Sequence, residues 1–162
     1  MTKHLDGIPQ PKKAKKVLMP VRVKKAKDKL EKLSHDFVRR RDSINPEEIK
    51  GYCIDCGKLC EGQQAQAGHW QPSGSCGAIL RYHPHNMHLQ AGGCNCGYHQ
   101  EQVKINYTMA MIKRYGKKYT QYLLELRNRT IKADINFYES LIELYEAGNE
   151  DEIANYLNLY GL

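Results

Sequence analysis

Residues 51–99 read GYCIDCGKLCEGQQAQAGHWQPSGSCGAILRYHPHNMHLQAGGCNCGYH. This stretch holds all six cysteines, the only tryptophan and five of the seven histidines of the 162-residue chain. Cysteine and histidine are the side chains that most readily bind a borderline-soft divalent metal, and packing alone does not gather so many of them in one short segment. We therefore expect a metal-organised centre here, which the rest of the chain supports.

The composition favours one folded domain with a modest core. Hydrophobic residues make up 41% of the chain and charged residues 27%, which is typical of a soluble protein and not of a disordered one. No run of about eighteen apolar residues occurs, and the lysine-rich start lacks the apolar region of a signal peptide. We therefore expect a reducing cytosolic setting, where clustered cysteines more often bind metal than pair as disulfides.

Positive charge is concentrated at the start of the chain. Residues 1–50 carry fifteen Lys and Arg against seven Asp and Glu, a net charge of +8, whereas the remainder carries −1. Such an arm is either a solvated tail that keeps the protein soluble or a sequence-independent phosphate binder whose affinity falls with salt. The first twenty residues are proline-containing and poor in large apolar side chains, so we expect them to be disordered until an anion orders them.

Helical periodicity is strongest outside the cysteine-rich stretch. Residues 21–41 place Leu30, Leu33, Phe37 and Val38 on one face, which predicts a helix docked on the core. Asn45-Pro46 predicts a short helix that Gly51 ends. Further helices are expected over 103–115, over 117–147, and after Gly148 with Asn149 as the cap. Their tyrosines at helical spacing indicate packing more strongly than base stacking.

Between Gln63 and Gln90 the pattern favours a β-hairpin with a long loop. Residues 67–72 form its first expected strand, with His69 on it, and residues 79–82 its second. Trp70 is expected to pack beneath this hairpin or to stack on an unpaired base. The hairpin is polar, so we expect a metal or helices to stabilise it.

Cys53 and Cys56 form a C-x-x-C pair followed by Gly57. Two thiolates on such a tight turn can hold one zinc ion, and the glycine permits a positive φ. A thioredoxin-like redox pair has the same spacing but requires a βαβ context and a helix that starts at the first cysteine. Residues 57–62 predict neither, so zinc is the preferred interpretation.

The order of motifs resembles the phage recombination protein NinG (Rap) family, structure-specific nucleases of branched DNA. The similarity runs from about residue 30 to residue 145, and it rests on C-x-x-C-G (53–57), A-G-H (67–69), L-R-Y (80–82), N-x-H-x-Q (86–90), C-N (94–95) and R-Y-G (114–116). The central part is also similar to HNH, or His-Me finger, nucleases, especially junction resolvases of the endonuclease VII type.

The resemblance implies an α+β fold. Its centre is a small zinc-stabilised ββα-metal (His-Me finger) core, flanked by a basic N-terminal helix and C-terminal helices. The expected divisions are a basic disordered arm (1–20), a basic helical segment (21–50), the nuclease core (51–116) and a C-terminal helical region (117–162).

The resemblance also implies roles for individual residues. His69 becomes the general base, Asn86 the brace of the loop that carries it, and Asn95 a ligand of a catalytic Mg²⁺; Cys53, Cys56 and Cys94 become ligands of a structural Zn²⁺. The chemistry agrees, because a neutral imidazole can take a proton from water, and Mg²⁺ prefers an amide oxygen to a thiolate.

Gly68 departs from the pattern of many HNH sites, where an acidic metal ligand precedes the histidine. The family that the chain resembles also has glycine there. The second ligand of the Mg²⁺ would then be His88 or His85, or the ion would rely on water and DNA phosphates.

Ala91 departs from the pattern as well, because the family has a cysteine there. Three zinc ligands remain, and a site with only three would be open and weak. The candidates for the fourth ligand are Cys96, Cys76 and Cys60, followed by His88 and His99, and the spacing does not choose among them.

Contacts with DNA are expected from basic side chains directed at phosphates, namely Arg81, Lys24, Lys25, Arg39 and Arg40. Arg81 could equally be a solvated residue. The expected partners are branched DNA, phage or host recombination proteins, and a second copy of the chain bound through the tyrosine-lined C-terminal helices. The expected location is the cytoplasm of a bacterial host.

The leading hypothesis is thus a Mg²⁺-dependent endonuclease that cuts Holliday junctions, displacement loops and other branched DNA. Two alternatives stay open. One is a non-catalytic zinc-binding DNA adaptor, for which Gly68 and Ala91 are the best support. The other is an HNH endonuclease that reads sequence, although no helix suited to reading base edges is evident.

Overall fold

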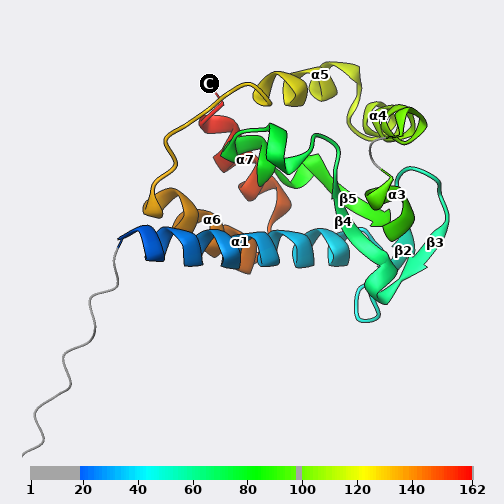
Figure 1. The fold of residues 1–162 in the computed structure, drawn as a ribbon, viewed down its shortest axis with the longest axis horizontal. Helices are drawn as coiled ribbons and strands as arrows, with labels where there is room; N and C mark the ends of the chain where they lie inside the picture. The colour runs from blue at the N-terminus through cyan, green and yellow to red at the C-terminus, as the bar shows by residue number, and fades with distance from the viewer. Residues whose placement is uncertain (1–18, 98–99, 162) are drawn as a thin grey trace, which may run out of the picture.

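The computed structural model describes residues 19–97 and 100–161 and shows a mixed α+β fold with seven helices and two small sheets, of which the three-stranded one lies at one end of the molecule (Figure 1). The arm expected to be disordered lies almost wholly outside the described residues. None of the described helices has the length and apolar character needed to cross a membrane.

The elements follow one another in a fixed order. They are α1 (Met19–Arg41), β1 (Ser43–Asn45), β2 (Lys50–Tyr52), β3 (Leu59–Glu61), η1 (Gly62–Gln64), β4 (Ala65–His69), η2 (Ser73–Ser75), α2 (Ala78–Arg81), η3 (Pro84–Asn86), β5 (Met87–Ala91), α3 (Gly92–Cys96), α4 (Glu101–Tyr115), α5 (Lys117–Leu126), α6 (Ile135–Ala147) and α7 (Glu150–Leu159). One antiparallel sheet has the order β1-β2-β3, and the other pairs β4 with β5.

Helix α1 confirms the predicted amphipathic helix. Leu30 and Val38 have no exposed surface, and Leu33 and Phe37 are partly buried beside them. The helix runs along α6 and across β4, so it joins the C-terminal helices to the strands (Figure 1). Apolar contact of this kind, and not helix propensity alone, is what holds a helix in place.

The expected long helix over residues 117–147 is wrong, because the chain forms two helices with an irregular link between them. Asp134 caps α6 by accepting a hydrogen bond from the Phe137 backbone N–H at 3.0 Å. The break lets α6 turn back onto α1. Tyr138 and Tyr145 are buried there, which confirms the packing interpretation for these two tyrosines.

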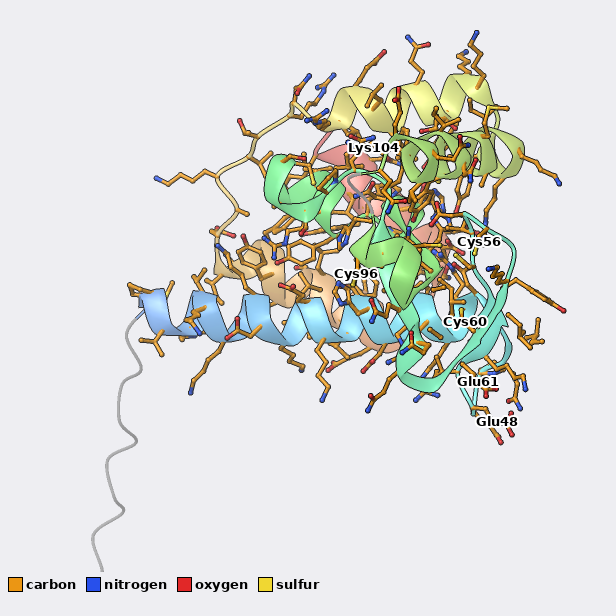
Figure 2. The ribbon with its side chains drawn as sticks, turned by 45° about the vertical axis from the view of Figure 1, so that its right-hand side comes forward. Glu48, Cys56, Cys60, Glu61, Cys96 and Lys104 are labelled. Atoms are coloured by element: carbon orange, nitrogen blue, oxygen red, sulfur yellow. The ribbon has the colours of Figure 1, made fainter. Side chains whose placement is uncertain are left out.

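The short helix expected after Pro46 is also wrong. Residues 46–49 form a turn, in which the Asn45 Oδ1 accepts a hydrogen bond from the Glu47 backbone N–H at 3.2 Å, and β2 follows at once. Ile49 has a positive φ of 50°, which a helix would not allow. The resulting three-stranded sheet ends in an acidic tip that bears Glu48 and Glu61 (Figure 2).

The hairpin has a different second strand from the one expected. Residues 78–81 form helix α2, where the adjacent Ile79 and Leu80 are both fully buried, and β4 pairs instead with β5. The register places His69 opposite Met87 and Gly68 opposite His88. Trp70 follows β4 and is 4% exposed, with its indole N–H donating to Thr108 Oγ1 at 3.0 Å.

Gly68 sits against the side chain of Gln90, which has no exposed surface. A Cβ added at Gly68 would meet Gln90 Cδ at 2.7 Å and overlap its Oε1. Because Gln90 cannot move into solvent, we expect Gly68→Ala to lower the free energy of unfolding by about 1–3 kcal/mol. Gly74→Ala is the control, since a Cβ there has no neighbour within 4 Å. Equal urea-unfolding midpoints for Gly68→Ala and Gly74→Ala would contradict the predicted loss of stability.

Candidate functional site

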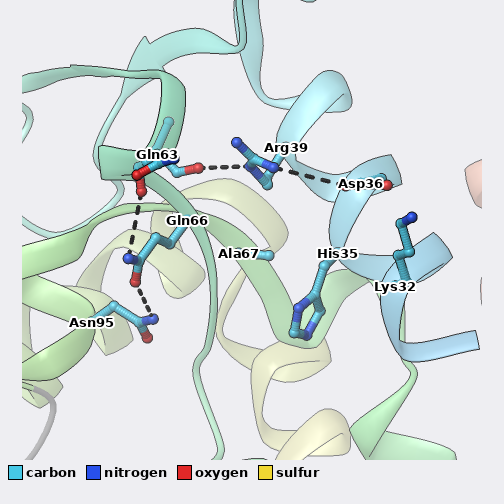
Figure 3. A pocket seen from close by; sticks show the side chains of 9 residues that line it. Lys32, His35, Asp36, Arg39, Gln63, Gln66, Ala67 and Asn95 are labelled. Atoms are coloured by element: carbon cyan, nitrogen blue, oxygen red, sulfur yellow. Dashed lines mark hydrogen bonds and ion pairs between the residues drawn. The ribbon is translucent and has the colours of Figure 1, made fainter. Parts of the chain in front are cut away.

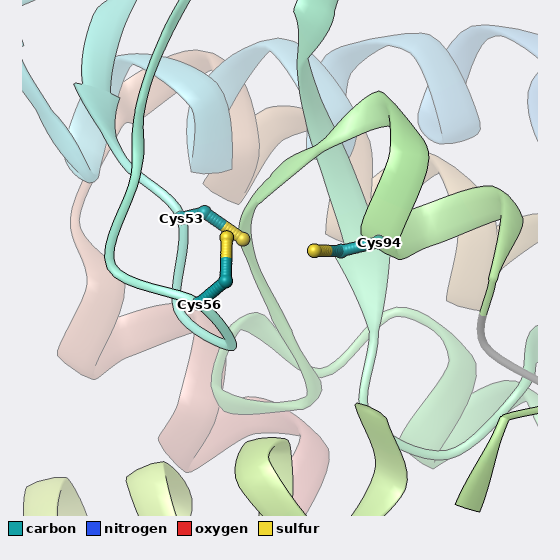
Figure 4. A group of neighbouring side chains, drawn as sticks. All are labelled: Cys53, Cys56 and Cys94. Carbon is teal, nitrogen blue, oxygen red and sulfur yellow. The ribbon is translucent and has the colours of Figure 1, made fainter. Parts of the chain in front are cut away.

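Three cysteines from two separate segments converge. The Sγ atoms of Cys53, Cys56 and Cys94 all lie within 4.8 Å of one another (Figure 4). Cys53 and Cys56 stand on the turn between β2 and β3, which Gly57 closes with a φ of 69°, as predicted, and Cys94 stands on α3. The three cysteines therefore join the turn to the helix.

The donor set of this trio fits a soft divalent metal such as Zn²⁺. Burial, together with the neighbouring Cys56 and Cys53 thiols, raises the pKa of the Cys94 thiol to about 12. Three thiolates this close repel one another unless a cation compensates their charge. A metal ion bound here would hold α3 against the turn, and its binding would release protons.

The remaining cysteines lie outside the trio. Cys96 follows Cys94 by two residues on α3, and a helix turns by about 200° over two residues, so the Cys96 side chain is exposed away from the trio (Figure 2). The Cys60 Sγ lies 3.5 Å from the Gly51 carbonyl, and the Cys76 Sγ lies 3.9 Å from the Ser73 carbonyl. His99, the other candidate, is outside the described residues.

His69 ends β4, and its ring is held in one orientation. Its Nε2 lies 3.1 Å from the backbone carbonyl oxygen of Arg81. A carbonyl oxygen only accepts hydrogen bonds, so Nε2 carries the proton and Nδ1 is the unprotonated nitrogen. Burial, together with the neighbouring His35, lowers the pKa of His69 to about 4. The imidazole is therefore neutral at pH 7.

Asn86 ties the ends of the long loop together. Its Oδ1 accepts from the Gln71 backbone N–H at 2.9 Å, and its Nδ2 donates to the carbonyl oxygens of Gln71 and Leu80 at 3.1 and 3.0 Å. The Trp70 backbone N–H donates to the Asn86 carbonyl at 2.8 Å. These bonds fix the backbone that directly follows His69.

Because Asn86 is fully buried, removing its amide breaks three hydrogen bonds to the backbone, two of them to Gln71 and one to Leu80. We expect Asn86→Ala to lower the free energy of unfolding by about 2–4 kcal/mol. The exposed Asn128 provides a control, and Asn128→Ala should change the stability by less than about 0.5 kcal/mol. Denaturant unfolding of both variants tests this, and a small effect at Asn86 would argue against its bracing role.

A pocket of about 460 Å³ lies between α1, the free edge of β4 and α3 (Figure 3). Its lining comprises Lys32, His35, Asp36, Arg39, Gln63, Ala65, Gln66, Ala67 and Asn95. The Asn95 Nδ2 donates to Gln66 Oε1 at 2.8 Å, so its Oδ1 is the atom that can bind a cation. The His35 ring meets His69 edge-on, with 5.6 Å between the ring centroids, and so connects the pocket to that histidine.

His88 and His85, the alternative Mg²⁺ ligands, are both engaged elsewhere. His88 is fully buried, and its two ring nitrogens lie 3.2 and 2.9 Å from the hydroxyls of Tyr107 and Tyr115. His85 lies 2.9 Å from the Tyr119 hydroxyl and 3.3 Å from Glu150. Either histidine would have to break a hydrogen bond or an ion pair before it could bind a metal ion.

The basic residues proposed as DNA contacts differ in whether they already form ion pairs or hydrogen bonds within the protein. Arg81 pairs with Glu31 at 2.9 Å, and Lys24 pairs with Asp28 at 3.1 Å. Arg39 Nε and Nη2 donate to the carbonyl oxygens of Ala65 and Gly62 at 2.7 and 2.8 Å. Lys25 and Arg40 are exposed, and Arg40 reaches the Pro46 carbonyl at 3.4 Å.

Sequence reasoning named Arg39 as a DNA contact but missed that its side of α1 lines a pocket, together with Lys32, His35 and Asp36. Lys32, His35, Asp36 and Arg39 follow one another at i, i+3, i+4 and i+7, which places them on one helical face. This polar stripe can be read from the sequence, but the helix was interpreted from its apolar face alone. Gln66 was missed because an isolated glutamine on a strand gives no signal.

Comparison with known proteins gives one match. No curated protein and no solved structure matches the chain. The family described as Bacteriophage Lambda NinG protein matches residues 9–152, which is most of the chain and includes the cysteine trio, His69 and the pocket. The chain therefore belongs to the bacteriophage lambda NinG protein family.

Proposed function

We propose that this protein is a structure-specific DNA endonuclease that hydrolyses phosphodiester bonds in branched recombination intermediates. The observation that carries the proposal is the neutral His69 imidazole, whose Nε2 is fixed on the Arg81 carbonyl so that Nδ1 is the basic atom. The chain order β4, β5, α3 is similar to that of a ββα-metal core, although η2, α2 and η3 lie between the two strands; His69 is on β4 and Asn95 on α3.

Each residue then has a defined part in the reaction. His69 Nδ1 accepts a proton from the attacking water, which makes the oxygen nucleophilic. Asn95 Oδ1 would hold a Mg²⁺ ion, since a hard cation prefers an oxygen ligand. When bound, that ion supplies positive charge to the phosphoryl oxygens and to the leaving 3′ oxygen. Asn86 keeps the loop after His69 in place.

The cysteine trio supports this site without taking part in the chemistry. Cys94 and Asn95 are neighbours on α3, so a zinc ion on Cys53, Cys56 and Cys94 would fix the helix that carries Asn95. Selectivity for shape follows from contacts with phosphates, because these position the protein on DNA without reading the bases.

A cutting assay tests the proposal. A four-way junction, a linear duplex and a single strand are each incubated with the protein in Mg²⁺ or in EDTA, and binding is measured in parallel. We expect the junction to be cut in Mg²⁺ only, with the linear duplex and the single strand left intact. Binding without cutting would overturn the proposal in favour of a zinc-binding adaptor. Cutting of the linear duplex at one sequence would favour a sequence-reading enzyme.

A further inference from the structure

The pocket beside His69 contains one cation that is not neutralised by the protein. Lys32 is exposed and makes no ion pair with any residue in the described ranges 19–97 and 100–161. Asp36, the pocket's one carboxylate, lies 3.7 Å from Arg39 Nη1 and is balanced by it. The lining therefore carries a net positive charge, located at Lys32.

The other wall of the pocket is lined by the neutral side-chain amides of Asn95, Gln66 and Gln63. The Asn95 Nδ2 donates to Gln66 Oε1, and the Gln66 Nε2 reaches the Gln63 carbonyl at 3.5 Å. Arg39 has two of its guanidinium nitrogens on the carbonyls along the edge of β4. Across from these amides, Lys32 and His35 both come from α1 and can donate hydrogen bonds to a ligand (Figure 3).

We propose that Lys32 and His35 bind a backbone phosphate of the DNA strand that is cut, next to the phosphate that is hydrolysed. This inference rests on the proposed function, and it adds a substrate contact from α1. His35 touches His69 edge-on, so a phosphate held by His35 lies beside the one that His69 serves. The volume of about 460 Å³ is sufficient for a sugar–phosphate unit.

The two residues would bind the phosphate in different ways. Lys32 contributes a full charge, and its contact releases counterions from the DNA. Burial lowers the pKa of His35, so at neutral pH it is uncharged and donates a single N–H. Lys32 therefore dominates the salt dependence of binding, whereas the directional hydrogen bond from His35 orients the phosphate.

The first test measures junction binding in EDTA, where no cutting occurs, as a function of salt. Lys32→Gln is expected to weaken binding and to reduce the slope of log K against log salt by about 1. Lys118→Gln is the matched control, because Lys118 is exposed on α5 and does not line the pocket. An unchanged slope for Lys32→Gln, or an equal reduction for both variants, would overturn the inference.

The second test locates the phosphate. Single phosphates of the junction are replaced one at a time by neutral methylphosphonates, and binding is measured for wild type and Lys32→Gln. At one position, adjacent to the cut where cutting occurs, the replacement should weaken binding by wild type but have no further effect on the variant. Additive effects at every position would refute a direct contact.

These binding tests are separate from the cutting assay. Suppose that one methylphosphonate and Lys32→Gln have non-additive effects on binding, as expected, but the wild type never cuts DNA. The proposed function then fails while the phosphate site stands. If wild type cuts the junction but no phosphate couples to Lys32, the proposed function stands while the phosphate site is refuted.

Discussion

His69→Ala is expected to reduce the rate of junction cutting by about 10²–10⁴-fold, with binding in EDTA close to that of wild type. The side chain that we propose as the proton acceptor would be absent, while the charges proposed to contact DNA would be unchanged. The measurement is single-turnover cutting at saturating protein, accompanied by thermal unfolding to show that the variant folds. Added imidazole should restore part of the lost rate, because it can act as the missing base.

The pH dependence gives an independent check. His69 must be neutral to act as a base, and its pKa in the free protein is lowered to about 4. We therefore expect kcat/KM to be nearly constant above pH 5 and to fall as the pH drops through 4. Undiminished cutting by His69→Ala, or an unaltered pH profile in a variant rescued by imidazole, would exclude His69 as the base.

Cys94→Ser is expected to abolish zinc binding and to lower the free energy of unfolding by more than about 4 kcal/mol. Cys94 is the member of the trio that comes from α3, so its loss disconnects this helix from the turn that carries Cys53 and Cys56. Removal of zinc from wild type with a strong chelator should produce the same instability. Zinc per chain and thermal unfolding are the measurements.

Cys76→Ser is the matched control for this experiment. Cys76 is a partly buried free cysteine outside the trio; it packs against the main core, and its Sγ lies 3.9 Å from the Ser73 carbonyl. Its replacement should leave the zinc content unchanged and the stability within about 1 kcal/mol of wild type. Pure wild-type protein that folds with no zinc would refute a structural role for the metal.

The sequence predicted correctly those parts of the fold where a residue pattern is compatible with only one local structure. Leu30, Leu33, Phe37 and Val38 repeat with the helical period over about two turns, and α1 forms accordingly. The glycines after α4 and α6 both adopt a positive φ, as the helix ends require. Cys53 and Cys56 were predicted as a pair from their C-x-x-C spacing, and Cys94 was added to them through the resemblance to the family; the structure brings all three together.

Short apolar runs were predicted poorly. Ile79 and Leu80 were interpreted as part of a strand, but both side chains are buried in the same core, and two adjacent strand residues point to opposite faces. A short helix satisfies that requirement. Strand β4 pairs instead with β5. Polar and apolar residues alternate along β5, yet four of its five residues are buried.

The candidate site shows the same limit. Cys96 matched the cysteine pattern by sequence, yet its place on α3 directs it away from Cys94, which only the helical geometry reveals. His35 is more than thirty residues from His69 in the sequence and reaches it through the docking of α1 on β4, which also places Lys32 in the pocket. Contacts of this kind depend on tertiary packing, which local periodicity does not encode.

The close fit between Gly68 and Gln90 has an evolutionary consequence. An acidic metal ligand at position 68 would need the space that the Gln90 side chain fills, and shortening Gln90 alone would leave a hole beside Asp55, to which its amide is hydrogen-bonded. Each change is unfavourable until the other has occurred, so the two positions are coupled. Homologues that acquire a carboxylate before the histidine are therefore expected to carry a smaller residue at position 90, and the two substitutions should covary.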